Sequence, residues 1–328
     1  MKRKTANSMM FIFILHTFAT LPLYSQGQPH AAPRTTTVGL SVLKDHRFLS
    51  NSAVRLPFIQ TFFRNNLGVG QALDLELPIL NIGDETIWGL RGDLMFVGLE
   101  FEYQHAVKSW MAPFLTFSIY GRLGSGVQSM LAQGMTYGSE LELGWLFRLR
   151  QTKRSQWAAS VNLWNSSGAV MNLYDYINGI IEDGPTPDNQ LFQSRPYLRG
   201  GGGLRYSWAA TRTTGLTVTG EFGYGESVDR RIDNKVYVNV LGAADLDLFQ
   251  SKYKVPLGFV LSAGVNTFAS GTDNTIAGDL LRSIFSVIYT GRPDFVLSVD
   301  VIWTRLPLKQ LDQTINSSMI MLNSKYIF

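Results

Sequence analysis

The stretch Met319-Ile-Met-Leu-Asn-Ser-Lys-Tyr-Ile-Phe328 decides the fold, because its residues alternate in character along the chain. One set of alternate positions holds Ile320, Leu322, Ser324, Tyr326 and Phe328. The other set holds Met319, Met321, Asn323, Lys325 and Ile327. Successive side chains of a β-strand point to opposite faces of its sheet. The pattern therefore predicts a strand whose first face is mainly apolar and ends in aromatic residues.

The same alternation recurs in several earlier segments. It is clearest in Met135–Leu149, where apolar side chains hold most odd positions and Glu140 and Glu142 stand at even ones. Similar patterns occupy residues 95–103, 236–248 and 295–304. Strands of roughly ten residues with aromatic residues near their ends are typical of transmembrane β-barrels. The sequence thus predicts an all-β, antiparallel, up-and-down transmembrane barrel in residues 35–328.

The first 25 residues have the parts of a secretion signal. A basic start at residues 2–4 precedes the apolar run Met9–Leu21, and Ser25 offers a small residue for cleavage. The apolar run is shorter than the roughly 20 residues that span a bilayer as a helix. This favours a cleaved signal peptide over an uncleaved anchor. We expect residues 1–25 to be removed and residues 26–34 to form a short periplasmic tail.

The composition narrows the class further. The chain has no cysteine, which excludes disulfides, metal thiolates and catalytic thiols. Only 16% of the residues are charged, and the net charge of +4 includes basic residues of the leader. We therefore expect no nucleic-acid partner, and neither a metal nor a cofactor.

The connections between the predicted strands alternate between long and short. Outer-membrane barrels have short periplasmic turns and longer external loops, so we count back from a periplasmic C-terminus. The predicted external loops are 305–316, 269–280, 226–234, 166–194 and 123–133. The predicted periplasmic turns are 292–294, 250–255, 209–212, 151–154 and 105–109. Within loop 166–194 the apolar residues from Val170 to Ile181 repeat at helical spacing, which predicts one short helix that folds into the mouth or caps the rim.

The layout before residue 105 allows more than one number of strands. The predicted strands there include 35–43 and 70–79. Either 54–63 is a further strand and 86–104 is one long strand, or the latter divides at Gly92-Asp93. Both versions give about fourteen strands, and twelve follows if one of these segments is a loop.

Charged residues at the polar positions of the strands are the candidate pore residues. The acidic candidates are Glu100, Glu102, Glu140, Glu142, Asp245, Asp247 and Asp300, with Asp74 and Glu76 as further acidic residues of an early strand. The basic candidates are Arg195, Arg199 and Arg205, which we place roughly across the barrel from the early acidic strands. Rings of charge set the selectivity of pores, but paired charges also stabilise a narrow lumen. The sequence leaves both roles open.

Two further features bear on function. Gly200–Gly203 interrupts the strand that carries the arginines, which indicates either a kink that opens the wall laterally or relief of crowding. His46, beside Asp45, is the one histidine that we expect in an external loop next to a carboxylate. A general base also needs a nucleophile or water within reach and a fixed orientation, and this pair shows neither. We therefore predict no catalytic residue and no enzyme.

The terminal strand resembles the C-terminal signal that the bacterial outer-membrane assembly machinery reads, with Tyr326 and Phe328 as its aromatic positions. The predicted barrel resembles outer-membrane porins and, through its strand number and Gly200–Gly203, the fatty-acid transporter family FadL. FadL proteins have an N-terminal plug with an Asn-Pro-Ala-type motif. This chain lacks that motif, although residues 44–68 can fold inward.

The resemblance implies an exported, integral outer-membrane protein of a Gram-negative bacterium. Its expected function is passive uptake of small or hydrophobic solutes through the barrel. Its expected partners are outer-membrane lipid or lipopolysaccharide, the barrel assembly machinery and the solute. Two other functions stay open, namely a structural or adhesive barrel with a plugged lumen and a barrel lipid hydrolase.

Overall fold

The computed structural model describes residues 41–82, 85–123, 134–171, 192–226, 234–267, 279–308 and 313–328. The chain divides into two units, Met1–Thr37 and Val38–Phe328, and all described residues belong to the second unit. The predicted signal peptide, the predicted tail and the predicted strand up to residue 40 lie outside the described residues. Most of the predicted loop helix does so too. Among the described residues, no helix has the length and apolar character needed to cross a membrane.

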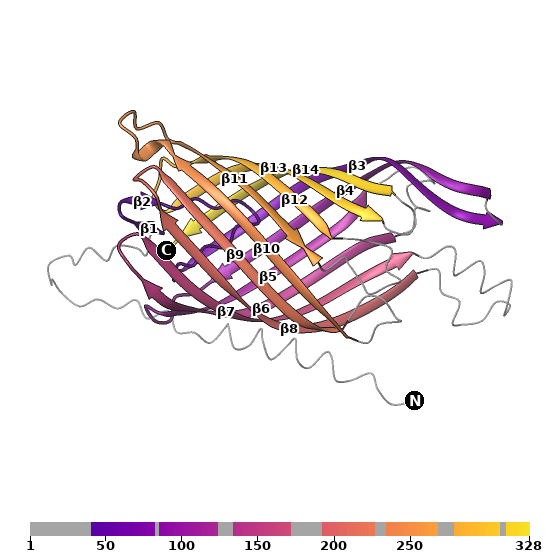
Figure 1. Cartoon of the computed structure of the whole chain (residues 1–328), viewed down its shortest axis with the longest axis horizontal. Coiled ribbons are helices and arrows are strands. Elements are labelled where there is room, and N and C mark those ends of the chain that lie inside the picture. The colour runs from indigo at the N-terminus through magenta and orange to yellow at the C-terminus, as the bar shows by residue number, and fades with distance from the viewer. Residues whose placement is uncertain are drawn as a thin grey trace, which may run out of the picture. The chain divides into compact units, whose positions relative to one another are not determined.

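Twelve antiparallel strands close into one barrel in which neighbours in sequence are neighbours in the wall (Figure 1). The first six are β3 (Phe62–Ile82), β4 (Glu85–Gln104), β5 (Met111–Leu123), β6 (Gly134–Gln151), β7 (Ser155–Met171) and β8 (Phe192–Ala209). The last six are β9 (Thr214–Glu226), β10 (Asn234–Asp247), β11 (Leu257–Asn266), β12 (Leu280–Tyr289), β13 (Phe295–Leu308) and β14 (Gln313–Ile327). One turn of 3-10 helix, η1 (Leu248–Gln250), follows β10. The predicted fold class is confirmed, with the lower of the two strand numbers.

The stretch from which the prediction started is the strand that closes the barrel. β14 pairs with β13 on one side and with β3 on the other. The second pairing runs from Ser317 opposite Ala72 to Ile327 opposite Phe62. Closure pairs the backbone groups that an edge strand would leave open. This is the only way for a sheet to satisfy its backbone within a bilayer.

The N-terminal part of the barrel has fewer strands than the fourteen-strand layouts. β4 runs unbroken through Gly92-Asp93, and β3 is one long strand that includes 70–79. Before β3 the described residues form only a small hairpin of β1 (Val42–Leu43) and β2 (His46–Arg47). The described residues 54–61 are not a strand. Their alternate apolar side chains are buried inside the barrel instead of forming part of its wall.

Most connections follow the predicted alternation of turns and loops, but two do not. The predicted external loop 305–316 is reduced to the connection 309–312 and β3 joins β4 through 83–84, so both are shorter than the turns 105–110 and 248–256. The turns at one end of the barrel are 105–110, 152–154, 210–213, 248–256 and 290–294. We call this the short-turn end, and both the C-terminus and the β1–β2 hairpin lie there (Figure 1). The connections at the opposite, long-loop end include 124–133 and 172–191, which lie outside the described residues. In outer-membrane barrels the short turns usually face the periplasm.

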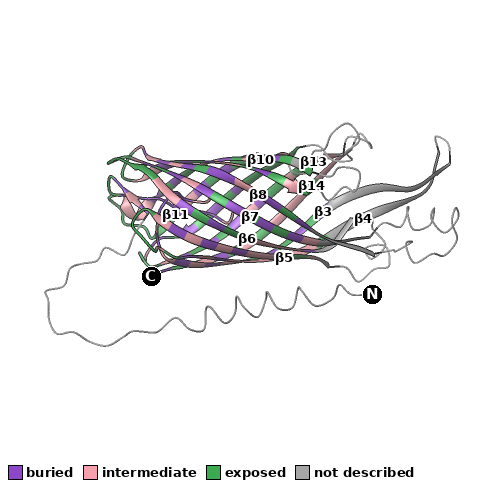
Figure 2. Ribbon diagram, turned by 90° about the horizontal axis from the view of Figure 1, so that it is seen from below, coloured by how far each residue is buried: buried purple, intermediate pink, exposed green. Residues whose placement is uncertain are grey.

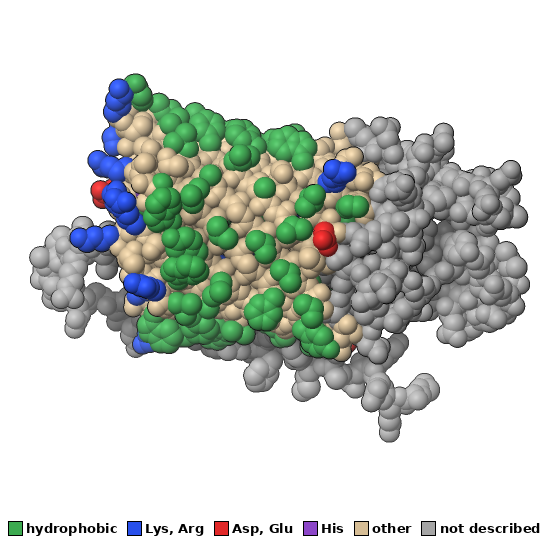
Figure 3. Space-filling model, in the orientation of Figure 1, with side chains coloured by type: hydrophobic (Ala, Val, Ile, Leu, Met, Phe, Trp, Pro, Cys, Tyr) green, Lys and Arg blue, Asp and Glu red, His purple; other side chains and the backbone are tan. Residues whose placement is uncertain are grey.

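The outward side chains of the strands form an apolar surface. Exposed large hydrophobic residues occur on each of the twelve strands, among them Leu163, Phe222, Leu261, Trp303 and Ile320. Buried and exposed residues alternate along the strands (Figure 2). Figure 3 shows hydrophobic side chains spread over one side of the wall. The wall therefore offers to its surroundings the apolar face that lipid requires.

Basic side chains gather at the short-turn end (Figure 3). Exposed residues of the turns there include Lys108, Lys153, Arg154, Arg212, Lys252, Lys254 and Arg292. The Arg292 guanidinium donates to the carboxylate of Asp294, with Nη2–Oδ2 at 2.6 Å, and this hydrogen bond holds the pKa of Asp294 below its usual value. The turns are thus polar and solvated, in contrast to the apolar wall.

The glycine tract Gly200–Gly203 leaves β8 in continuous register with both of its neighbours. Pairing with β7 and β9 continues through all four glycines without a shift. A Cβ atom added to Gly201 would lie 2.1 Å from the carbonyl oxygen of Phe222. The tract therefore allows a close approach of backbones, which agrees with relief of crowding. The described strands show no lateral opening at this point.

Candidate functional site

Residues 41–61 lie inside the barrel toward its short-turn end (Figure 1), and we call this segment the plug. Its side chains pack against the inner wall in two apolar clusters. The first contains Leu43, Phe48, Val54, Leu56 and Phe58 with Ala209 and Leu241 of the wall. The second contains Leu49 with Val260, Ile288 and Val296 of the wall. The plug therefore occupies the space that an open pore would leave to water.

Two residues attach the plug at the short-turn end. His46 is fully buried, and its Nε2 lies 2.7 Å from Oδ1 of Asp245 on β10. Its Nδ1 lies 3.2 Å from the carbonyl oxygen of Arg212. Arg47 donates through Nη1 to the carbonyl oxygens of Thr290 and Arg292, at 3.1 and 2.7 Å. The hairpin is thus bound to two separate turns of the barrel.

A second set of contacts lies deeper in the lumen. Arg55 forms two hydrogen bonds with Glu142 on β6, with Nη1–Oε1 at 2.7 Å and Nη2–Oε2 at 2.5 Å. Its Nη1 also lies 3.5 Å from Oε1 of Glu221 on β9. A guanidinium and a carboxylate carry opposite charges and form two directed hydrogen bonds, which makes the pair strong. Arg55 therefore fixes the plug against two parts of the wall.

Further hydrogen bonds complete the attachment. Asn51 Nδ2 donates to Ser262 Oγ at 2.9 Å, and the backbone N–H of Ser52 donates to Asp300 Oδ2 at 2.7 Å. Where the plug returns toward β3, Gln104 Nε2 donates to the carbonyl oxygens of Phe58 and Gln60 at 3.0 and 2.9 Å. The bonds of Asp300 and Gln104 satisfy backbone groups of Ser52, Phe58 and Gln60 that a segment outside any sheet would otherwise leave unpaired.

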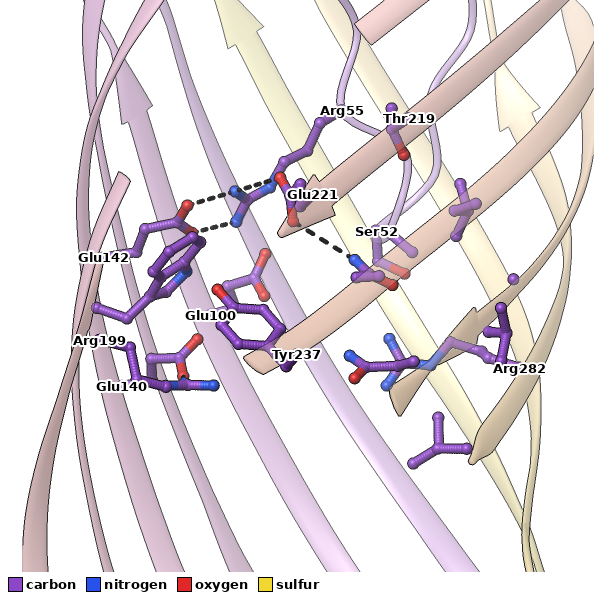
Figure 4. Close-up of a pocket in the computed structure, with 18 of the residues that line it drawn as sticks. Ser52, Arg55, Glu100, Glu140, Glu142, Arg199, Thr219, Glu221, Tyr237 and Arg282 are labelled. Atoms are coloured by element: carbon purple, nitrogen blue, oxygen red, sulfur yellow. Dashed lines mark hydrogen bonds and ion pairs between the residues drawn. The ribbon is translucent and has the colours of Figure 1, made fainter. Parts of the chain in front are cut away.

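A cavity of about 270 Å³ lies on the long-loop side of the plug (Figure 4). Its lining combines four arginines, four glutamates and several aromatic residues, contributed by the plug and by the strand wall. The charged lining residues are Arg55, Arg64, Arg199, Arg282, Glu100, Glu140, Glu142 and Glu221. The aromatic lining residues are Tyr120, Trp164, Tyr197 and Tyr237. Ser52 and Ala53 of the plug form part of its boundary. The cavity is therefore polar and ends at the plug.

The structure places the predicted lumen residues on the inner side of the wall, but only some of them reach the cavity. Glu100, Glu140, Glu142 and Arg199 line it. Asp245 and Asp300 bind the plug instead. Glu102 and Arg205 lie below the cavity beside the plug, and Asp247 accepts a hydrogen bond from the N–H of Phe249. The side chains of Arg195, Asp74 and Glu76 lie outside the described ones.

The predicted separation of an acidic and a basic wall is wrong. Arg199 on β8 lies two strands from β6, and its Nη2 contacts Oε2 of Glu140 at 2.8 Å. Arg205 stands over the ring of Phe114, 5.2 Å from its centroid, on the same side of the barrel. The inference failed because the position of a strand around the wall depends on the strand number, which the sequence left open. The charges are interleaved as local pairs.

His46 also differs from its expected position. It lies at the short-turn end, fully buried, and its partner is Asp245 instead of the adjacent Asp45. Both of its ring nitrogens contact oxygen atoms of the wall. The residue therefore holds the plug in place. Tyr326 and Phe328, the predicted assembly signal, are exposed on the outer face.

Several residues of the site carried no distinctive signal in the sequence. Glu221 and Arg282 occupy inward positions of short strands with little other charge, and Tyr237 alternates with valines. Arg55 stands in a segment whose alternation resembles that of a strand. Pro57 is the one signal against a strand there, since proline cannot donate to a sheet ladder.

The closed barrel, its apolar outer face and its polar interior define an integral β-barrel protein of the outer-membrane type. No protein-family model matches the sequence, and no curated protein matches it either.

Among solved structures, the chain is similar to the KdgM porin, with 7% identity, a TM-score of 0.41, and coverage of 80% of this chain and 99% of that chain. It is also similar to a deltaS2 mutant of the TodX monoaromatic hydrocarbon channel, with 9% identity, a TM-score of 0.46, and coverage of 82% and 90%. A third similar structure is the translocator domain of the autotransporter NalP from Neisseria meningitidis, with 9% identity, a TM-score of 0.44, and coverage of 84% and 90%.

Proposed function

We propose that this protein is an outer-membrane channel for small polar solutes, closed at its periplasmic end by its own N-terminal plug. The observation that carries the proposal is the polar cavity of about 270 Å³ bounded below by residues of the plug. A barrel that served only as a scaffold has no need of an accessible polar chamber. The chamber is large enough to hold a small solute, and the plug is the segment that separates it from the short-turn end.

The nature of the lining favours polar over hydrophobic solutes. Hydrophobic ligands are held in pockets lined mainly by apolar side chains. Here the partly exposed groups include the carboxylates of Glu100 and Glu140, whose side chains are 29% and 34% exposed. An apolar solute would have to remove water from these charges without replacing their hydrogen bonds, which is unfavourable.

The plug is attached in a way that permits movement. Several of its contacts with the wall are hydrogen bonds between uncharged groups, such as that of Asn51 with Ser262, and water can replace these at a modest net cost per bond. The segment is joined to the wall through the chain only at β3 among the described residues. A shift of the plug toward the periplasm therefore opens a path without breaking any strand pairing.

A second candidate is a structural barrel whose lumen stays blocked. The two apolar clusters between plug and wall favour it, because they stabilise the closed state. A barrel hydrolase is less well supported, since both ring nitrogens of His46 are engaged by the wall.

Planar-bilayer recording separates the two candidates. We expect wild-type protein to show brief single-channel steps, and Arg55→Ala to show longer or more frequent ones, because this substitution removes the deepest attachment of the plug. Folding is checked by the heat-dependent mobility of barrels in gels. Silent bilayers with well-folded wild type and Arg55→Ala would support the structural barrel and reject the channel.

Export and assembly remain part of the same proposal. We propose cleavage of residues 1–25, insertion by the barrel assembly machinery through Tyr326 and Phe328, and contact with outer-membrane lipid or lipopolysaccharide. Membrane fractionation of wild type and of Phe328→Ala tests this. Wild type is expected in the outer membrane with a mature mass, and Phe328→Ala is expected to accumulate there at a lower level.

A further inference from the structure

Arg282 differs from the other arginines of the cavity. It lies on β12 with its side chain in the lumen, it lines the cavity, and it is exposed (Figure 4). In the part of the chain that the structure describes, no hydrogen bond or ion pair engages it. Its cross-strand neighbours are Gly264 on β11 and Thr304 on β13, neither of which carries a charge. These two positions therefore provide no carboxylate for this guanidinium, and Asp300 of β13 accepts a hydrogen bond from the plug.

The remaining arginines of the cavity all have carboxylate partners. Arg55 binds Glu142, and Arg199 binds Glu140 at 2.8 Å. Arg64 contacts Glu102 at 2.5 Å and is 4% exposed. Since these three cations are already neutralised by the protein, they have little capacity left for a solute.

Glu100, whose charge acts on Arg282, already has other partners. Glu100 accepts a hydrogen bond from Asn66 Nδ2 at 2.8 Å and lies 3.5 Å from Arg64 Nη2. It stands on β4, and Glu140 stands on β6, so the partly exposed acids belong to a different part of the wall from β12. The cavity thus has an accessible cation on one side and accessible acceptors on another.

We propose that Arg282 binds the carboxylate of a small organic solute within this cavity. A guanidinium presents a planar fork of donors that matches a carboxylate. The hydroxyl or amino groups of the same solute can donate to Glu100 and Glu140. The volume of about 270 Å³ is near the lower end of ligand pockets, which limits the solute to a small molecule. The inference rests on the proposed function, because it names the class of solute for the same chamber.

Binding to the full-length protein in detergent tests the inference independently of conduction. The probes are lactate and lactamide, which have nearly the same shape but differ in the charge that Arg282 would recognise. Saturation-transfer NMR titration suits weak binding. We expect wild type to bind lactate at least about fivefold more tightly than lactamide, as for a charge-assisted bond that stays in contact with water.

Three variants locate the effect. Arg282→Gln is expected to remove the preference for lactate, whereas Arg282→Lys retains part of it because the charge remains. Arg305→Gln is the matched control, since Arg305 lies one strand away on β13 at an exposed position of the opposite face. It is expected to leave the preference unchanged.

The outcomes separate this inference from the channel itself. No preference in wild type, a preference that survives Arg282→Gln, or an equal loss in Arg305→Gln overturns the Arg282 site. An Arg282-dependent preference in a protein that never conducts keeps the site and rejects the channel. Conduction without any preference for lactate keeps the channel and rejects the site.

Discussion

His46 Nε2 lies 2.7 Å from Asp245 Oδ1, and both side chains are almost completely buried although 199 residues separate them in sequence. The contact joins the plug to the strand wall at the short-turn end. Removal of the partner of a buried carboxylate strongly destabilises the folded protein, because the remaining charge is neither paired nor solvated. This pair is therefore a sensitive probe of how firmly the plug is held.

Replacing His46 with alanine should destabilise the folded protein. Removal of one partner of a buried pair costs on the order of 3 kcal/mol, and the edge contact of His46 with Phe48 is lost as well. The free energy of unfolding, from urea titration of the refolded barrel, measures the effect. His105→Ala is the control, since His105 is exposed in the turn 105–110. Equal loss of stability in both variants would contradict the assigned role.

Replacing Arg55 with alanine should loosen the inner part of the plug before it affects the wall. Hydrogen exchange followed by mass spectrometry should show faster exchange of residues 48–61 in Arg55→Ala, while the strands keep their protection. The reason is that both acidic partners of Arg55 stay attached to strands that are paired along their length. Arg292→Ala is the control, because Arg292 binds Asp294 within an exposed turn. Uniform acceleration across the strands in Arg55→Ala would contradict local loosening.

Glu140 and Glu142 should respond differently to the change to glutamine. Glu140 is partly exposed to the cavity, so Glu140→Gln is expected to shift the reversal potential of single-channel openings toward anion selectivity. Glu142 is buried between Arg55 and Asn162, so Glu142→Gln should mainly change the frequency of opening. Glu226→Gln, at an exposed position of β9, is the control. An unchanged reversal potential in Glu140→Gln would remove this residue from the solute path.

Two neighbouring glycines of β8 should tolerate alanine to very different degrees. A Cβ on Gly201 would lie 2.1 Å from a backbone oxygen of β9, whereas a Cβ on Gly200 meets nothing within 4 Å. Overpacking of this kind typically costs about 1–3 kcal/mol. Gly201→Ala should therefore lower the thermal midpoint of the barrel, and Gly200→Ala should leave it nearly unchanged. Similar midpoints for the two variants would show that the strands can separate at this point.

The sequence predicted the barrel because the side chains of a membrane strand alternate between those that face lipid and those that face the lumen. Segments such as 135–149 alternate between lipid and lumen, and the lengths of the connections give the orientation. The number of strands was harder to predict, since residues 54–61 also alternate between apolar and polar side chains without forming a strand of the wall. Their apolar side chains face other buried residues within the barrel.

The site could be predicted only in its parts. Glu140, Glu142 and Arg199 were recognisable as inward charges, but their partners depend on the order of strands around the wall. The role of Arg55 required knowledge that its segment turns into the lumen. The predicted position of His46 was wrong for the same reason. Its partner Asp245 is also far from it in the sequence. Such contacts are long-range and leave no local pattern.

The central claim is that the plug closes the channel and must move for solute to pass. A reversible tether tests it most directly, since the chain has no cysteine of its own. Asn51→Cys combined with Ser262→Cys replaces two side chains that are hydrogen-bonded at 2.9 Å across the plug and the wall. The reduced double variant should show the same single-channel steps as wild type, and oxidation should abolish them until a reductant is added. Steps of equal size and frequency in the oxidised and reduced protein would contradict the claim.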